Sequence, residues 1–165
     1  MALQPIIRSR ERPAAAAGKT AAVRPAAGES RKRYCIILRI RHRDLNPDEI
    51  TSTLGWQPNV SWRAGEQSVT PTGRPLASVR TDGLWSRQFE WGTDQAISDS
   101  LNEVLQHLAR HEQLFHRLDD ISAQTALYLQ LPGSLNIGDH IGCETLGKFA
   151  NLRIALEIEV FPDWK

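Results

Sequence analysis

A short helix with complete start and stop signals follows directly after an apolar strand, and this pair constrains the fold more than any other feature of the chain. Asn46 is a favoured cap residue, Pro47 occupies the first helical position, and Glu49 comes three residues after the cap. Gly55 can adopt the left-handed conformation that commonly ends a helix. We therefore expect a strand, a short docked helix between Asn46 and Gly55, and a turn in immediate succession.

Alternation of apolar and polar residues predicts the strands. Between Tyr34 and His42, Arg39 and Arg41 alternate with apolar residues, as expected of a strand with one buried face. Asp82-Gly83 separates two further runs and is typical of a two-residue hairpin turn, so a β-hairpin is expected there. The predicted strands cover residues 34–42, 76–81, 84–91, 123–131 and 152–160.

Apolar residues at helical spacing predict one long helix over residues 95–118 and another over 143–151. The element order is then βαββαβ followed by an added αβ unit, which is the ferredoxin-like order with an extension. We therefore expect an α+β fold with an antiparallel-rich sheet and helices on one face. If the first and last strands are neighbours, arginines on one would pair with glutamates on the other. The other sheet face would present Arg39, Arg41, Tyr128, Gln130, Glu157 and Glu159 to solvent or to a partner.

Several short motifs in the same region support a family resemblance. They are Leu38-Arg39-Ile40, Pro47-Asp48-Glu49-Ile50-Thr51, Leu54-Gly55-Trp56-Gln57-Pro58 and Trp62-Arg63-Ala64-Gly65, followed by Trp85 and Leu146-Gly147-Lys148-Phe149-Ala150. From Tyr34 to Val160 the chain resembles the bacterial domain-of-unknown-function 4279 family. The resemblance implies a small α+β domain without an assigned catalytic residue. It also implies a context, because some relatives are suspected to be immunity proteins of toxin systems.

The first 33 residues differ in composition from the rest of the chain. They hold eight Lys/Arg and two Asp/Glu among alanines and prolines, whereas residues 34–165 hold twelve and seventeen. A segment with so few large apolar groups cannot offset the entropy of ordering it, so residues 1–33 are predicted to form a disordered basic tail. Residues 34–165 are long enough for a single α+β domain.

The tail contains no apolar run long enough for a secretory signal or a membrane span. The cytoplasm is therefore the default location, and no membrane contact is expected. An arginine-rich leader is also compatible with an organellar transit peptide, or with an over-extended start of the coding region. Nucleic acid is not an expected partner, because the domain is acidic and its predicted open sheet face lacks the aromatic pattern of RNA-recognition domains.

Tryptophan and arginine gather in the loop and hairpin that follow the first predicted helix. Arginine presents a fork of donors to carboxylate or phosphate groups, and tryptophan is enriched in binding hot spots. Tryptophan is also an efficient core filler, so a structural role is the competing interpretation. The residues predicted to bind a ligand or partner are Trp56, Trp62, Arg63, Arg80, Trp85 and Arg87.

Catalytic and metal-binding patterns are weak. His107 and His111 lie four apart, but no glutamate follows His107 as it does in metalloproteases. His140 and Cys143 could form a base and thiol pair, yet their loop has no identifiable oxyanion donors. We therefore predict no metal, no cofactor and no catalytic residue.

The sequence thus favours a non-catalytic interaction domain with a protein partner, and the family context suggests a toxin-neutralising immunity protein. A small-molecule or anion-binding domain built on the tryptophan and arginine region is the alternative. An enzyme that uses Cys143 or a histidine is the third hypothesis. The predicted fold also allows a homodimer through an exposed edge strand.

Overall fold

The computed structural model describes residues 33–161 apart from residues 71, 91, 94 and 134–136. The predicted tail, apart from its last residue, lies outside the described residues, as does the end of the strand predicted over 84–91. The elements follow one another as β1 (Cys35–His42), α1 (Pro47–Leu54), β2 (Val60–Trp62), β3 (Gln67–Val69), β4 (Pro75–Val79), β5 (Gly83–Gln88), α2 (Ile97–Ala109), α3 (Glu112–Asp120), β6 (Gln124–Pro132), α4 (Cys143–Asn151) and β7 (Ala155–Phe161).

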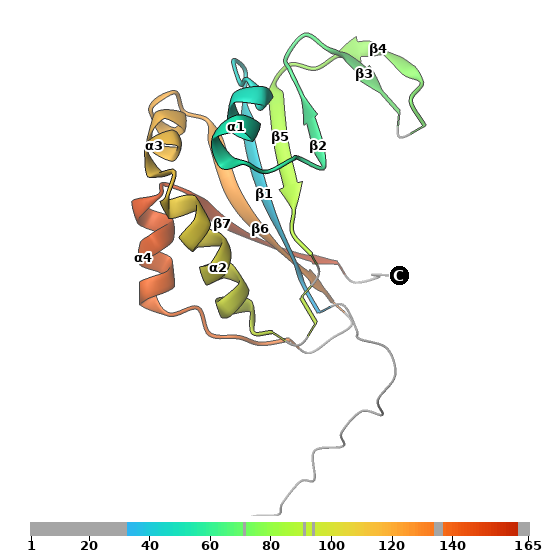
Figure 1. Ribbon diagram of the computed structural model, residues 1–165. Helices are drawn as coiled ribbons and strands as arrows, with labels where there is room; N and C mark the ends of the chain where they lie inside the picture. Colours follow the sequence, from blue (N-terminus) through green and yellow to red (C-terminus); the bar gives the residue numbers. More distant parts are fainter. Residues whose placement is uncertain (1–32, 71, 91, 94, 134–136, 162–165) are drawn as a thin grey trace, which may run out of the picture.

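The strands form a five-stranded sheet in the order β2-β5-β1-β6-β7, and β3 pairs with β4 in a separate two-stranded sheet. Neighbours in the larger sheet are antiparallel except β6 and β7, which are parallel and connected through α4. The first four strands of this sheet have the ferredoxin-like order, and β7 is the added strand. Figure 1 shows the helices together on one side of the sheet. The predicted α+β fold, antiparallel-rich with helices on one face, is confirmed.

The start and stop signals of α1 act as the sequence predicts. The Asn46 side chain accepts a hydrogen bond from the Asp48 amide at 3.2 Å. At the other end, Gly55 has a φ of 67° and its amide donates to the Thr51 carbonyl. Ile50 is buried in the core, so packing against the sheet adds to these local signals.

The core lies between the helices and the covered face of the sheet. Leu38 and Ile40 point into it from β1, and Leu127 and Leu129 point into it from β6. Burying one such side chain stabilises the fold by about 1.5–3 kcal/mol. The helices α2 and α3 contribute Ile97, Leu101, Val104, Leu105, Leu108, Leu114, Phe115 and Leu118. Residues that alternate with these core positions on β1 and β6 must face the opposite side of the sheet.

The predicted hairpin around Asp82-Gly83 is wrong. β4 pairs with β3 in the small sheet, whereas β5 pairs with β1 and β2 in the large sheet. A two-residue hairpin turn needs positive φ angles, but Gly83 has none and already belongs to β5, opposite His42. Glycine has a packing role here instead, because a Cβ atom at this position would approach the Leu45 Cβ to 2.9 Å.

The single helix predicted over residues 95–118 is also wrong, because the structure divides it into α2 and α3. The chain turns at Arg110 and His111, whose amides bond to carbonyls three residues back rather than four. The turn falls in a stretch between Leu108 and Leu114 that offers no large apolar residue to the core. It allows α3 to pack against β6 and to bury its own apolar residues.

Candidate functional site

The face of the five-stranded sheet that carries no helix is the candidate site, and we call it the open face (Figure 1). On β1 it presents Arg39 and Arg41, which alternate with the core residues Leu38 and Ile40. The strand register adds Val60, Trp62, Leu84, Tyr128, Gln130, Glu157 and Glu159 from the neighbouring strands. The side chains predicted for this face from strand alternation are therefore found on it.

The chemical character of the open face changes in a fixed order from one edge to the other. An apolar end on β2 and β5 comes first and consists of Val60, Trp62 and Leu84. The two arginines of β1 follow, then two polar residues of β6, and finally the two glutamates of β7. A partner that covered the whole face would meet apolar, basic and acidic zones in succession.

The expected pairs between the arginines and the glutamates do not form, because β6 lies between β1 and β7. The Arg39 Cζ atom instead lies 4.2 Å from the centroid of the Tyr128 ring. The Glu157 carboxylate lies near enough to Tyr128 to raise the pKa of its phenol, and the Gln130 amide donates to Glu159 at 2.7 Å. One side chain of β6 therefore contacts the basic zone and another contacts the acidic zone.

The Tyr128 phenol stays neutral beside the Arg39 guanidinium and the Glu157 carboxylate. Burial raises the pKa of its phenol above the ordinary value of 10.0, and the nearby Glu157 carboxylate raises it further. Arg39 lowers the pKa of Tyr128, but the net effect of its surroundings is a raised pKa. The phenol therefore keeps its proton at neutral pH and can offer it as a hydrogen-bond donor.

The two arginines of the open face differ in their partners. An Arg41 guanidinium nitrogen lies 2.9 Å from the Asp82 carboxylate, and Arg41 Nε donates to the same group at 3.1 Å. Within the described residues, no carboxylate forms an ion pair with Arg39. Arg39 is consequently the better placed of the two to bind an anionic group from another molecule.

Two open hollows flank these arginines, and both arginines line each of them. One hollow has a volume of about 470 Å³ and extends over β6 towards Tyr128 and Glu157. The other, of about 380 Å³, extends over the apolar end of the face. Because neither hollow is enclosed, they suit protruding groups of a larger partner better than complete burial of a small molecule.

Of the six residues predicted to bind a ligand or partner, Trp62 and Arg80 lie together at the apolar end of the open face. The Arg80 Cζ atom is 3.9 Å from the centroid of the Trp62 ring. The indole Nε1 of Trp62 donates to the Asp82 carbonyl at 3.0 Å. This tryptophan is thus held in place beside the second hollow, where it can contact a partner.

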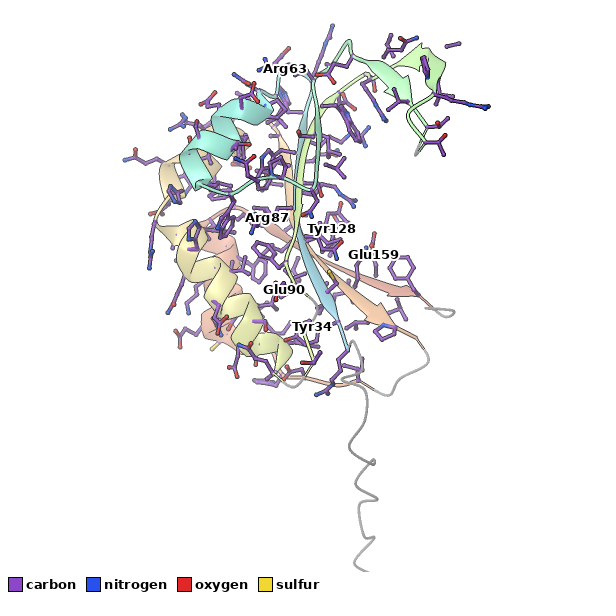
Figure 2. All side chains as sticks on the ribbon, turned by 45° about the vertical axis from the view of Figure 1, so that its right-hand side comes forward. Tyr34, Arg63, Arg87, Glu90, Tyr128 and Glu159 are labelled. Carbon is purple, nitrogen blue, oxygen red and sulfur yellow. The ribbon has the colours of Figure 1, made fainter. Side chains whose placement is uncertain are left out.

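Trp56 and Arg87 lie on the other side of the sheet, and Figure 2 shows Arg87 and Tyr128 on opposite sides of it. Trp56 stacks on His107 with ring centroids 3.9 Å apart. One Arg87 guanidinium nitrogen donates to the Gln57 carbonyl at 2.8 Å, whereas its buried Nε has no hydrogen-bond partner among the described residues. These two residues therefore cannot act together with Trp62 in one pocket.

The remaining two predicted residues have structural contacts. Trp85 is fully buried in the core, and its Nε1 donates to the Thr51 hydroxyl at 3.0 Å. Arg63 donates to the Asn46 side chain at 2.7 Å and forms an ion pair with Asp48, at the start of α1. Figure 2 shows Arg63 far from Glu159. The six predicted residues are thus divided among separate places, and their binding roles stay predictions.

Other candidate chemistry is sparse in the described part of the chain. No group of three or more His, Cys, Asp or Glu residues there could hold a metal ion. Cys143 is exposed at the start of α4, and no hydrogen bond joins it to His140 among the described contacts. Nearby Asp139 accepts a hydrogen bond from the Ser98 amide at 3.1 Å, which lowers the pKa of its carboxyl. Its contacts are those of a helix cap.

Part of the open face gave no usable sequence signal. β2 has three residues, too few for alternation to reveal which of them share a face with Arg39. The sequence predicts Asp82 only as a turn residue, although its carboxylate pairs with Arg41. Arg153, which lines the first hollow, has a φ of 54° and pairs with Asp119, neither of which the sequence indicates.

The fold and the open face define a small α+β domain of the ferredoxin-like order with one helix-free sheet surface. A family model described as "Domain of unknown function (DUF4279)" matches residues 32–161, and the protein belongs to this family. No curated protein and no solved structure gives a significant match to the chain. Among the described residues, no helix has both the length and the apolar character required to cross a membrane.

Proposed function

We propose that this DUF4279 domain is a non-catalytic interaction domain that binds a partner protein through its open face. The observation that carries the proposal is the helix-free face on which basic, aromatic and acidic side chains lie in register. Sheets often leave one face solvated, so this observation needs further support. The support comes from the two hollows and from Arg39, which has no ion-pair partner among the described carboxylates.

A protein suits this face better than a small molecule. Sites for small ligands usually bury most of the ligand in a concave pocket, whereas the hollows here are open to solvent. Protein interfaces are broader and use arginine and aromatic side chains as anchors. Arg39, Trp62 and Tyr128 are side chains of this kind, and they come from three strands of one surface.

Within this proposal, the specific role we favour is that of a cytoplasmic immunity protein that neutralises a toxin. Such a protein needs no catalytic residue, only a surface that covers the active site of the toxin. The acidic zone at Glu157 and Glu159 would speed the encounter with a basic toxin, because long-range charge affects association rates more than affinity. A toxin-like reading frame beside the gene would support this role, whereas a metabolic operon would favour ligand binding.

The proposal is tested by capturing proteins from the native cytoplasm with the full-length chain as bait. We expect the wild-type chain to bind one stoichiometric partner, with an acidic group of the partner opposite Arg39. Arg39→Glu should then retain less than about a tenth of that partner, because the reversal places two carboxylates against each other. Arg110→Glu is the matched control, since Arg110 is exposed at the end of α2, on the helical side. The control should capture as much partner as the wild type.

Equal capture by all three forms would contradict the open face as the binding surface. No capture by any form would favour binding of a small anionic ligand. The structure divides the tryptophan and arginine region that the sequence offers for such a ligand, so we place it at Arg39, which has no ion pair among the described residues. Inorganic phosphate should then shift the NMR signal of the Arg39 guanidinium group. An unchanged signal would contradict the alternative as well.

A further inference from the structure

β7 forms one edge of the five-stranded sheet and exposes large apolar side chains, which natural edge strands usually avoid. Ile158 and Val160 are 57% and 60% exposed, although Ile158 lies beside the buried Leu129, on the side that the helices cover elsewhere. The described residues place no strand beyond β7. Between Leu156 and Val160, the outward-facing backbone groups of β7 therefore have no strand partner among the described residues.

A second copy of this chain is a poor occupant of the β7 edge. In a two-fold antiparallel pair, residues that face each other share a side of the sheet. If Ile158 lies on the two-fold axis, Glu157 faces Glu159 of the other copy. If Glu157 or Glu159 lies on the axis, that glutamate faces the same glutamate of the other copy. Registers in which the axis passes through a residue nearer either end of β7 pair only the end of the strand. Like charges directly opposite each other are destabilising, so the glutamates act against self-pairing.

We propose that β7 binds an extended segment of a partner protein as an additional strand, and that this segment alternates basic with apolar residues. Its basic side chains would face Glu157 and Glu159 on the open side. Its apolar side chains would cover Ile158 and Val160 on the other side. Backbone hydrogen bonds give such strand addition its affinity, and the alternating side chains give it specificity.

This inference shares Glu157 and Glu159 with the open face but differs from the open-face proposal, because it requires the backbone of β7 and does not require Arg39. The probe is a short synthetic peptide in which lysine alternates with valine, and its counterpart has glutamate in place of lysine. Binding to the full-length chain is followed by fluorescence anisotropy. Exchange of the β7 amide hydrogens is measured on the same samples.

We expect the lysine peptide to bind at least about tenfold more tightly than the glutamate peptide, because two charge pairs change sign. It should also slow exchange at the outward-facing amides of β7. Glu157→Lys combined with Glu159→Lys should reverse the preference between the two peptides. Arg39→Ala should leave binding of the lysine peptide unchanged, which separates this result from any loss at the open face.

Equal binding of the two peptides, or binding without slower exchange in β7, would overturn the inference. Slow exchange in β7 before any peptide is added would overturn it too, because the edge would then already be occupied. The molecular mass would identify that occupant: a dimer indicates a second copy, and a monomer indicates another segment of the same chain. Either result would be incompatible with an edge open to a partner.

Discussion

At the scale of single residues, Asp139 replaces a helix cap that α2 lacks. Ala96 lies at the cap position and has no side chain able to accept a hydrogen bond, whereas Asp139 accepts one from the Ser98 amide. That hydrogen bond is the main reason why the pKa of the Asp139 carboxyl is lowered. The ionised carboxylate is thus the form that stabilises the start of α2.

Asp139→Ala should lower the free energy of unfolding by about 1 kcal/mol at neutral pH, as expected for the loss of a helix cap. Because the folded state lowers this pKa, its stabilisation is fully present above the ordinary aspartate pKa and is lost as the pH falls through the lowered value. The difference between wild type and variant should therefore shrink in acid. Urea denaturation at a series of pH values measures it.

Asp44→Ala is the control for this measurement, since Asp44 is exposed and its carboxylate caps no helix in the described structure. If Asp139→Ala were as much less stable than the wild type in acid as at neutral pH, the capping role would be contradicted. The cap could not be predicted from the sequence, because Asp139 lies 41 residues from Ser98. The cap at Asn46 could be predicted, because its donor is two residues away.

At the scale of secondary-structure elements, Gly83 determines how closely β5 approaches the connection between β1 and α1. Gly83→Ala should reduce the free energy of unfolding by about 1–3 kcal/mol, because the added methyl group overpacks the site. The structural cause is that its Cβ would lie 2.9 Å from the Leu45 Cβ and 3.0 Å from the Leu45 carbonyl oxygen. Chemical denaturation measures the change.

Gly138→Ala is the matched control, because a Cβ there has no neighbour within 4 Å and this glycine has no positive φ. It should leave stability nearly unchanged. If both glycine variants had the same stability, the close packing of β5 against Leu45 would not be the reason for glycine at position 83.

The elements that the sequence predicts correctly are those with local signals. Helix α1 has its own cap and glycine stop, and alternation places Arg39 and Glu157 on one face. The errors concern pairing and packing between distant segments. Asp82-Gly83 is a favoured hairpin sequence, but β5 does not pair with β4. It pairs instead with both β1 and β2 in the large sheet, while β4 pairs with β3. The turn between α2 and α3 likewise depends on the position of β6.

At the scale of the whole molecule, the order of elements was enough to predict an α+β sheet with one open face. The composition of the site was harder to predict, because closeness in sequence does not determine which side of a sheet a residue faces. Trp62 lines a hollow of the open face, whereas the adjacent Arg63 contacts the start of α1. The tryptophan and arginine cluster of the sequence is therefore divided in the structure, and Arg39 becomes the centre of the candidate site.

The most direct test of the central claim is hydroxyl-radical footprinting of the complex between the full-length chain and the partner it captures. The account predicts that oxidation of Trp62 and Tyr128 slows in the complex, because the partner covers the open face. Ile121 and Leu146, which are 49% and 48% exposed on the helical side, should react as in the free chain. Protection of Ile121 and Leu146 with unchanged oxidation of Trp62 and Tyr128 would contradict the account.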